Sequence, residues 1–210
     1  IPYILVGSIK FYQRQEIKDL LSYLKLIANP KDNSSLLRII NTPSRKIGKK
    51  TISDLSSIAS ILNLTIFDTI KQIVEKNIPS ELQKKLSKGS LERIKEFYLL
   101  LIQLLDISKS TTISEIINHI IQKTQYEEYL KHHFDHHEER LENITEFKNI
   151  AWDFSKNNNE DSLILFLERI SLVNDTDNID ERSSEYLTLI TLHQAKGLEY
   201  PVIFIVGMEE

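Results

Sequence analysis

Apolar side chains recur at helical spacing over most of this chain, and no other feature of the sequence constrains the fold as strongly. Leu20, Leu21, Leu24 and Ile27 form one such series, and residues 91–105 form another. Spacings of three and four residues place apolar side chains on one face of an α-helix. The 210 residues include only five glycines and five prolines, which are the residues least compatible with helix interiors. The sequence therefore predicts a mainly α fold.

Polar residues at the expected helix starts support this assignment. Thr112 and Glu115 have the spacing of a capping box, in which each residue satisfies a backbone amide of the other. Residues 32–34 supply caps for a second, shorter helix. We therefore expect several separate helices joined by short turns.

Short β-prone segments occur at both ends of the chain. Residues 3–6 are apolar and precede Gly7-Ser8, and residues 187–191 and 202–206 are again apolar and rich in β-branched side chains. The acidic, aperiodic stretch 173–184 has the character of an exposed connector. This order predicts a multi-helix domain inserted into an α/β domain whose sheet is only partly present.

Composition limits the kinds of partner and location. A formal net charge of -4 excludes a uniformly basic coat, so any contact with DNA must be local. The absence of cysteine excludes disulfides and is compatible with a cytoplasmic location. Apolar runs fall short of the roughly 18–20 residues of a membrane span, and Ile1-Pro2-Tyr3 does not begin a signal peptide. We expect a soluble protein without a membrane partner.

The ends of the chain indicate that it belongs to a larger protein. The first residue is Ile1 and not an initiator Met, and the last residues, Met208-Glu209-Glu210, directly follow an apolar run. The sheet predicted from the end segments is correspondingly incomplete.

The most specific motif lies near the C-terminal end. Residues 191–200 read Thr-Leu-His-Gln-Ala-Lys-Gly-Leu-Glu-Tyr and precede the apolar residues 201–207. A polar loop after a strand of an open α/β sheet faces the crevice in which ligands bind. The order of strand, Thr-Leu-His, two residues, Lys-Gly-Leu-Glu-aromatic and second strand resembles motif V of UvrD/Rep/PcrA-type superfamily 1 DNA helicases.

The resemblance implies roles for five residues of this loop. Thr191 and His193 are suited to hydrogen bonds with single-stranded DNA, and Lys196 is suited to a phosphate. Gly197 and Glu199 would couple the position of the DNA to the state of ATP. For any one residue alone, a turn without function is an equally ordinary interpretation, but about ten residues in register favour the family.

A second block near the N-terminus also resembles the family. Residues 11–19 read Phe-Tyr-Gln-Arg-Gln-Glu-Ile-Lys-Asp, the pattern that follows the fourth conserved motif and opens a helix. Phe11 and Tyr12 offer stacking faces for bases, while Arg14 and Lys18 attract phosphate. Alternatively, the aromatic pair packs as a hydrophobic staple and the charges pair along the helix.

Residues 41–51 resemble the Gly-Ile-Gly hairpin that the family's inserted domain lays against duplex DNA. The resemblance implies contacts through backbone amides and a helix N-terminus, with help from basic side chains. The residues predicted to bind DNA here are Arg45, Lys46, Ile47, Gly48, Lys49, Lys50 and Thr51. Lys46 replaces the family's first glycine. Without the resemblance, this segment would be interpreted as a solvated turn.

Gly48-Lys49-Lys50-Thr51 is similar to the end of an ATPase phosphate loop, but the similarity is incomplete. That motif requires a glycine five positions before its Gly-Lys pair and a Ser or Thr directly after the lysine. This chain has Pro43 and Lys50 at those positions. We therefore predict no catalytic residue, and we expect that this chain alone does not hydrolyse ATP.

Four histidines have the spacing of helical metal ligands. His132 and His136, and likewise His133 and His137, are four residues apart. No cysteine and no pattern of outer hydrogen-bonding partners accompanies them. A hydrated segment is the preferred interpretation, and no metal site is predicted.

The resemblance extends over nearly the whole chain and implies three regions. Residues 1–27 and 186–210 would belong to the second RecA-like domain, called 2A, and residues 28–185 would form the helical inserted domain, called 2B. Within 2B, Arg140 and Asn143 are expected to tie helices together.

In the full-length protein the resemblance implies an ATP-dependent 3′-to-5′ DNA helicase or translocase of DNA repair or replication. Its cofactors would be ATP and Mg²⁺, and its partners single-stranded and duplex DNA. Repair or replication proteins would bind through 2B. The alternatives are a noncatalytic protein- or DNA-interaction module related to helicases, and a subunit of a helicase-nuclease.

Overall fold

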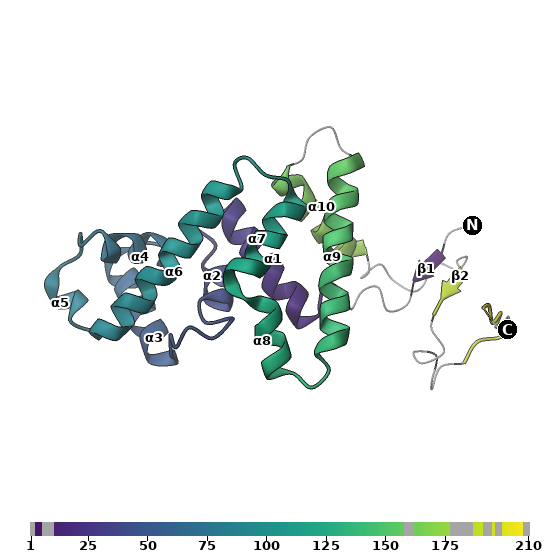
Figure 1. Ribbon diagram of the computed structural model, residues 1–210, viewed down its shortest axis with the longest axis horizontal. Helices are drawn as coiled ribbons and strands as arrows, with labels where there is room; N and C mark the ends of the chain where they lie inside the picture. The colour runs from purple at the N-terminus through teal and green to yellow at the C-terminus, as the bar shows by residue number, and fades with distance from the viewer. Residues whose placement is uncertain are drawn as a thin grey trace.

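The computed structural model describes residues 3–5, 11–157, 162–176, 187–190, 195 and 199–207. Helices dominate these residues, so the expectation of a mainly α fold is confirmed (Figure 1). The helices are α1 (Gln15–Ala28), α2 (Asn33–Ile39), α3 (Lys49–Leu62), α4 (Ile66–Val74), α5 (Ser80–Gln83), α6 (Lys88–Ile107), α7 (Ile113–Thr124), α8 (Tyr126–His133), α9 (His137–Asn157) and α10 (Leu163–Thr176). Within that part of the chain, none combines the length and apolar character that a membrane crossing requires.

Two short strands, β1 (Tyr3–Leu5) and β2 (Leu187–Leu189), lie at the opposite end of the molecule from α3, α4 and α5 (Figure 1). They pair in parallel, with Tyr3 opposite Leu187 and Leu5 opposite Leu189. Both lie within segments that the sequence predicts as strands. The first described residues and residues 187–189 therefore meet in one small sheet.

The strand predicted for residues 202–206 is not formed, and that prediction was wrong. The segment has no helix or strand, and each side chain from Val202 to Val206 is more than half exposed. Among the described residues, β1 and β2 pair only with each other. Within the described part of the chain, the segment thus has no strand beside it to complete its backbone hydrogen bonds or to cover its apolar side chains.

Helix α1 lies at the centre of the helical body and contacts α2, α7, α9 and α10. Ile17, Leu20, Tyr23 and Leu24 on this helix are completely buried, so the face predicted from the apolar spacing is the buried one. Burying a side chain of this size stabilises the fold by about 1.5–3 kcal/mol. The domain boundary expected between residues 27 and 28 falls in the last turn of α1, and the division there stays a prediction.

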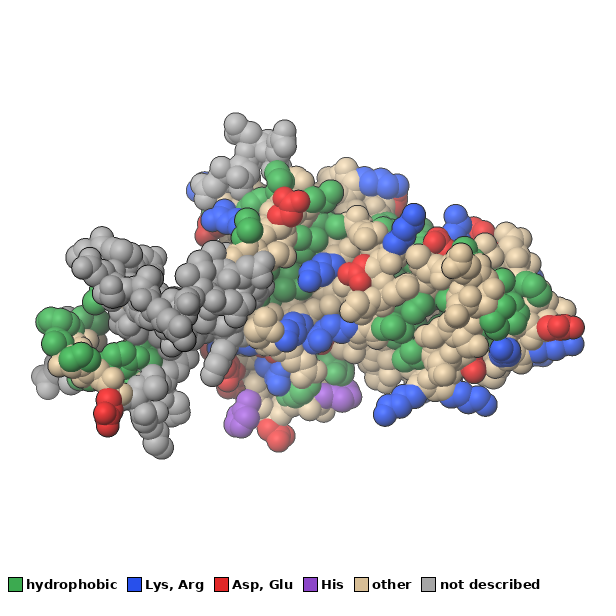
Figure 2. Space-filling view, turned by 180° about the vertical axis from the view of Figure 1, so that it is seen from behind, with side chains coloured by type: hydrophobic (Ala, Val, Ile, Leu, Met, Phe, Trp, Pro, Cys, Tyr) green, Lys and Arg blue, Asp and Glu red, His purple; other side chains and the backbone are tan. Residues whose placement is uncertain are grey.

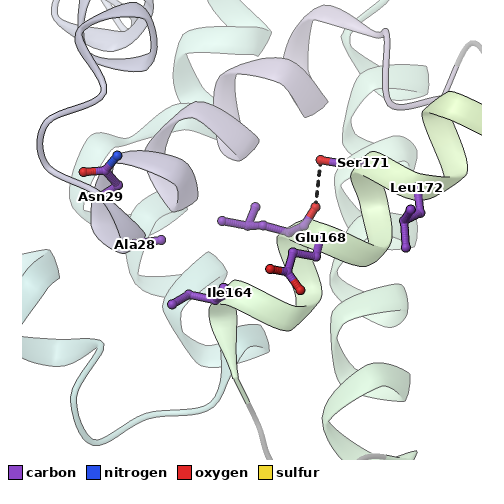
Figure 3. A pocket seen from close by; sticks show the side chains of 7 residues that line it. Ala28, Asn29, Ile164, Glu168, Ser171 and Leu172 are labelled. Atoms are coloured by element: carbon purple, nitrogen blue, oxygen red, sulfur yellow. Dashed lines mark hydrogen bonds between the residues drawn. The ribbon is translucent and has the colours of Figure 1, made fainter.

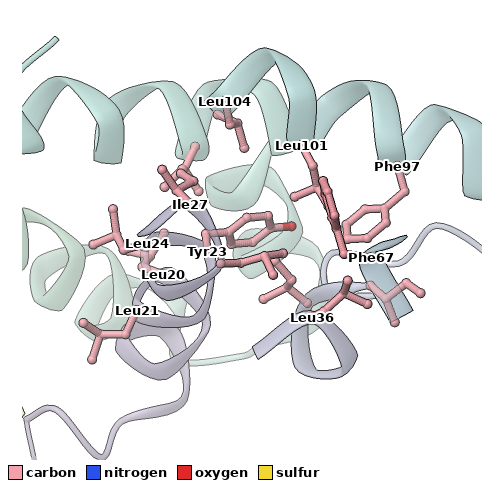
Figure 4. Close-up of a cluster of buried hydrophobic side chains, with 14 of the residues drawn as sticks. Leu20, Leu21, Tyr23, Leu24, Ile27, Leu36, Phe67, Phe97, Leu101 and Leu104 are labelled. Carbon is pink, nitrogen blue, oxygen red and sulfur yellow. The ribbon is translucent and has the colours of Figure 1, made fainter. Parts of the chain in front are cut away.

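A second group of buried side chains joins α1 to α2 and α6 (Figure 4). Tyr23 lies among Leu36, Phe97, Leu101 and Leu104, each of which is almost fully buried. These contacts bring residues near the start of the chain against the long helix α6. One hydrophobic core therefore extends from α1 through α6 to α3 and α4.

Local capping explains where two of the helices begin. The backbone amide of Glu115 donates to Thr112 Oγ1 at 3.3 Å, and the amide of Thr112 donates to Glu115 Oε2 at 2.9 Å. The predicted capping box at the start of α7 is therefore confirmed. At the start of α2, Asp32 Oδ1 accepts from the amide of Ser35 at 3.0 Å.

Candidate nucleic-acid interface

The loop between α2 and α3 is held in one shape by its own side chains. Asn41 Oδ1 accepts from the backbone amides of Arg45 at 2.8 Å and Ile47 at 3.1 Å. The peptide bond between Thr42 and Pro43 is cis. Ile47 is buried and anchors the end of the loop in the core. The predicted hairpin is thus an ordered structure directly before α3.

Arg45 points its guanidinium into this loop and not towards solvent. Its Nη2 donates to Tyr23 Oη at 2.6 Å, and the guanidinium carbon lies 5.1 Å from the centre of the Phe97 ring. Its Nη1 donates to four backbone carbonyls, at 2.8 Å to Ile39, 3.4 Å to Ile40, 3.3 Å to Thr42 and 3.2 Å to Pro43. The structure therefore places Arg45 as a brace of the loop.

Tyr23 completes this arrangement from α1. Burial raises the pKa of Tyr23 to about 12, although the neighbouring Arg45 cation opposes the shift. The phenol stays protonated at neutral pH and donates to the carbonyl of Thr42 at 2.8 Å. A buried hydroxyl with both a donor and an acceptor partner costs little to desolvate.

The remaining cations of the segment are exposed at the start of α3. Lys46, Lys49 and Lys50 all point to solvent. Gly48 is the N-cap of α3, forms no side-chain cap, and has nothing within 4 Å of the position that a Cβ would occupy. The first amides of α3 therefore have no side-chain cap, and uncapped amides at a helix start attract anions.

A second helix begins beside this one. Thr51 Oγ1 on α3 lies 3.1 Å from Ser90 Oγ on α6, and Arg93 Nη1 donates to the carbonyl of Lys46 at 3.2 Å. Lys88, in the first turn of α6, is exposed. We call the starts of α3 and α6 with these lysines the paired-helix surface. Figure 2 shows basic side chains projecting from this end of the helical body.

The predicted aromatic pair is placed mainly in the core. Phe11 is 9% exposed and packs edge-on against Tyr12, with the ring centres 5.2 Å apart. Tyr12 is half-buried. The burial of Phe11 agrees with the staple interpretation, because a buried ring has no free face for a base.

Arg14 is held by residues of α9. Its Nη1 hydrogen-bonds to Asn143 Oδ1 and lies 3.3 Å from Glu139 Oε1. Asn143 is buried, whereas Glu139 is exposed. The structure therefore gives Arg14 a packing role between the start of α1 and α9.

Two buried carboxylates on α1 fasten it to three other helices. Glu16 accepts from Arg140 Nη1 at 2.6 Å and from Asn143 Nδ2 at 2.7 Å, so the expectation that Arg140 and Asn143 tie helices together is confirmed. Asp19 accepts from Arg38 Nε at 2.7 Å and Tyr126 Oη at 2.6 Å. Sequence reasoning missed both acids. The sequence did contain a sign of their burial: Glu16 and Asp19 are three residues apart and lie next to Ile17 and Leu20 on the apolar face of the helix.

Comparisons with known proteins show the family of this chain. The family model described as "UvrD-like helicase C-terminal domain" matches residues 1–210. The chain belongs to this family. Its resemblance to UvrD/PcrA-type superfamily 1 helicases, predicted from the motifs, is confirmed by this match.

Individual relatives in the family are similar over the same length. The protein named "ATP-dependent DNA helicase PcrA" from Staphylococcus epidermidis is 40% identical over 213 aligned positions. The protein of the same name from Staphylococcus aureus strain Mu50 is 41% identical over 213 positions. Each alignment covers 100% of this chain and 28% of the relative. The chain thus spans a little over a quarter of the length of these relatives.

The C-terminal motif of the family falls largely outside the described residues. Thr191, His193, Lys196 and Gly197 are not among the described residues. Glu199 is described, is exposed, and belongs to neither a helix nor a strand. Its role in coupling stays a prediction.

The histidines do not converge within the described chain. His133 Nδ1 lies 2.9 Å from the carbonyl of Tyr129, and His137 Nδ1 lies 3.3 Å from the carbonyl of Phe134. Within the described ranges, no group of three or more His, Asp or Glu side chains is arranged to hold a metal ion.

Proposed function

We propose that this chain is the DNA-contacting and regulatory part of an ATP-dependent 3′-to-5′ DNA helicase. The observation that carries the proposal is the paired-helix surface, found in a chain of the UvrD-like helicase C-terminal domain family. Lys46, Lys49 and Lys50 meet there at the uncapped start of α3. In this proposal residues 28–185, which carry α2 to α10, form the inserted 2B domain. Residues 1–27, with β1 and nearly all of α1, and residues 186–210, with β2, belong to the second RecA-like domain.

The paired-helix surface binds the backbone of duplex DNA in this proposal. Each helix N-terminus carries roughly half a positive charge. The uncapped amides of α3 match phosphate oxygens, whereas at the start of α6 Ser87 Oγ already accepts from the amide of Ser90 at 3.1 Å. The exposed lysines add charges that displace condensed counterions from the duplex. Arg45 contributes indirectly, because it holds the loop that presents Lys46 and Gly48.

In this proposal the residues that contact single-stranded DNA and respond to ATP lie near the C-terminal end of the chain. Thr191, His193 and Lys196 contact the single strand, and Gly197 and Glu199 pass the state of ATP to that contact. ATP and Mg²⁺ are bound by the full-length protein, and this chain without a phosphate loop does not hydrolyse ATP. The printed name of the Staphylococcus relatives, ATP-dependent DNA helicase, supports this assignment.

Duplex binding by the full 210-residue chain tests the surface. The variant Lys46→Glu/Lys49→Glu/Lys50→Glu is compared with Lys71→Glu/Lys109→Glu/Lys123→Glu, which makes the same change of charge at exposed lysines of other elements. Log K falls as log salt rises, and each duplex phosphate that the protein no longer neutralises makes this fall shallower by about 0.9. We expect a clear reduction of affinity and of slope only in the first variant. Equal reductions in both variants would contradict the proposed surface.

The full-length protein tests the activity and its direction. A helicase of 3′-to-5′ direction separates a duplex that carries a 3′ single-stranded tail and leaves a 5′-tailed duplex intact. ATP hydrolysis should rise when single-stranded DNA is added. A full-length protein that binds DNA without hydrolysing ATP would support the noncatalytic interaction module instead.

A further inference from the structure

A polar groove of about 330 Å³ runs between α1 and α2. Lys18, Ser22 and Lys25 line it from one face of α1, since residues four and seven apart lie above one another on a helix. Ser34, Ser35 and Arg38 line it from α2. Three cationic side chains and three serine hydroxyls therefore line one hollow, which Tyr12, Gln13 and Leu21 complete.

The cations of this groove are available to a ligand. Lys18 is half-buried and Lys25 is exposed, and neither ammonium forms a hydrogen bond or ion pair with the described residues. Arg38 is oriented through Nε by Asp19, whose side chain is 3% exposed, and through Nη2 by the carbonyl of Gln15 at 3.4 Å. No described residue accepts a hydrogen bond from its Nη1. The guanidinium is thus fixed in place with one donor group free.

Asp32, an acid beside the groove, keeps its negative charge: although burial opposes the shift, hydrogen bonds from Ser35 and the charge of Lys25 hold the pKa of its carboxyl below the ordinary value. Asp32 accepts from the amide of Ser35 at 3.0 Å and from Ser35 Oγ at 2.5 Å. Asp19 is buried behind Arg38 and is engaged by it. The three cations Lys18, Lys25 and Arg38 outnumber these two acids, so the net charge around the groove is positive, which suits an oxyanion with several acceptor atoms.

A larger hollow nearby has the opposite chemistry. It occupies about 620 Å³ between the end of α1 and α10, and Figure 3 shows Ile164 and Leu172 on its wall. Its one charged lining residue is Glu168. An apolar wall with an acid does not attract phosphate, so the basic lining of the α1–α2 groove is a local property.

We propose that the groove between α1 and α2 binds a phosphate group in the backbone of a single DNA strand. Lys18 and Lys25 neutralise the charge, Arg38 Nη1 donates to one oxygen, and the Ser34 hydroxyl donates to another. This site rests on the proposed function, because it extends the DNA path from the paired-helix surface to α1. It also replaces Arg14, which α9 holds, as the cation that serves the strand in this part of the chain.

Binding of a fluorescently labelled oligo(dT) of about 10 nucleotides to the full chain, followed by anisotropy, tests the site. Lys18→Glu/Lys25→Glu should weaken binding about tenfold at low salt and reduce the salt slope by about 0.7 for each phosphate that is no longer neutralised. The neutral variant Lys18→Gln/Lys25→Gln should fall between it and the unchanged chain. Lys71→Glu, an exposed charge reversal on α4, serves as the control. Unchanged affinity and slope in both groove variants would overturn the proposal.

Two further measurements separate the possible causes. Amide NMR signals of Ser34 and Ser35 should shift with oligo(dT). Shifts with inorganic phosphate alone, and none with the oligonucleotide, would overturn the assignment to a DNA strand. If the groove variants bind oligo(dT) normally while the paired-helix variant no longer binds duplex DNA, the groove fails and the proposed function stands. If the unchanged chain binds neither DNA, the proposed function itself fails.

Discussion

Arg45 and Tyr23 are joined by a hydrogen bond of 2.6 Å that connects the loop before α3 to the middle of α1. The same guanidinium also holds the loop through its carbonyl oxygens. Arg45 lies in a basic, glycine-containing segment, yet its guanidinium turns inward and bonds within the protein. The exposed positive charge of this segment comes from the lysines around it.

Replacing Arg45 by alanine should lower the free energy of unfolding by about 2–3 kcal/mol, because several buried carbonyls and the Tyr23 hydroxyl lose a charged donor. Urea denaturation followed by circular dichroism measures the change. Lys50→Ala, at an exposed position in the same segment, should change the value by less than about 0.5 kcal/mol. An Arg45→Ala chain of normal stability that no longer bound duplex DNA would make Arg45 a DNA ligand and not a brace.

Replacing Lys46 by glycine should stabilise the fold. Lys46 has a φ of 58°, in the left-handed region that disfavours residues with a Cβ, whereas glycine adopts it without steric cost. We expect a gain of about 0.5–1 kcal/mol in the free energy of unfolding, together with weaker duplex binding because one cation is removed. Lys50→Gly, inside the first turn of α3, should instead destabilise by about 1 kcal/mol. A loss of stability in both variants would contradict the strain at Lys46.

Replacing Tyr126 by phenylalanine should cost about 1–3 kcal/mol, since the buried Asp19 carboxylate loses its 2.6 Å hydrogen bond from the phenol. Thermal or urea unfolding reports the loss. Tyr129→Phe is the matched control, because no described residue hydrogen-bonds to its half-buried hydroxyl. Equal stability of the two variants would show that the bond to Asp19 adds nothing.

The Asp19 carboxyl should make stability depend on pH in the direction opposite to most acids. Burial raises its pKa above the ordinary 3.8, although hydrogen bonds and charge from Tyr126 and Arg38 oppose the shift. The folded state then binds more protons than the unfolded state between 3.8 and the raised pKa. Stability from this group therefore falls as pH rises through that window.

Comparison of the unchanged chain with Asp19→Asn isolates this effect. The free energy of unfolding of the unchanged chain, minus that of the variant, should decrease as pH rises from below 3.8 towards neutrality. Urea titrations at several pH values give this difference. A difference that increases with pH would mean that the cations around Asp19 outweigh its burial.

The apolar spacing was sufficient to predict the buried face of α1, and the residue pattern was sufficient to predict the capping box at Thr112. Both are local, because helix period and capping act within a few residues. The inward turn of Arg45 was not predictable in this way. It depends on Tyr23 and Phe97, which are distant in sequence and meet the loop only through packing.

The same limit applies to the ends of the chain. The apolar residues 202–206 have strand composition, yet a strand also requires a neighbour for its backbone, and composition does not specify one. For Glu16 and Asp19, acids on an apolar helix face were visible in the sequence. Their partners Arg140 and Tyr126 lie more than 100 residues away, as the sequence separations of 124 and 107 show.

The parallel pairing of β1 with β2 has a consequence for how the helical body can be altered. Antiparallel neighbours can be joined by a two-residue turn, whereas parallel neighbours need a connection that returns along the sheet, usually of a dozen residues or more. Because β1 and β2 are parallel, everything between them acts as that return connection. The helices therefore form the crossover connection itself and are not an insertion into a β-hairpin. Any shortened version of this protein must keep a crossover, for which α1 is already in place.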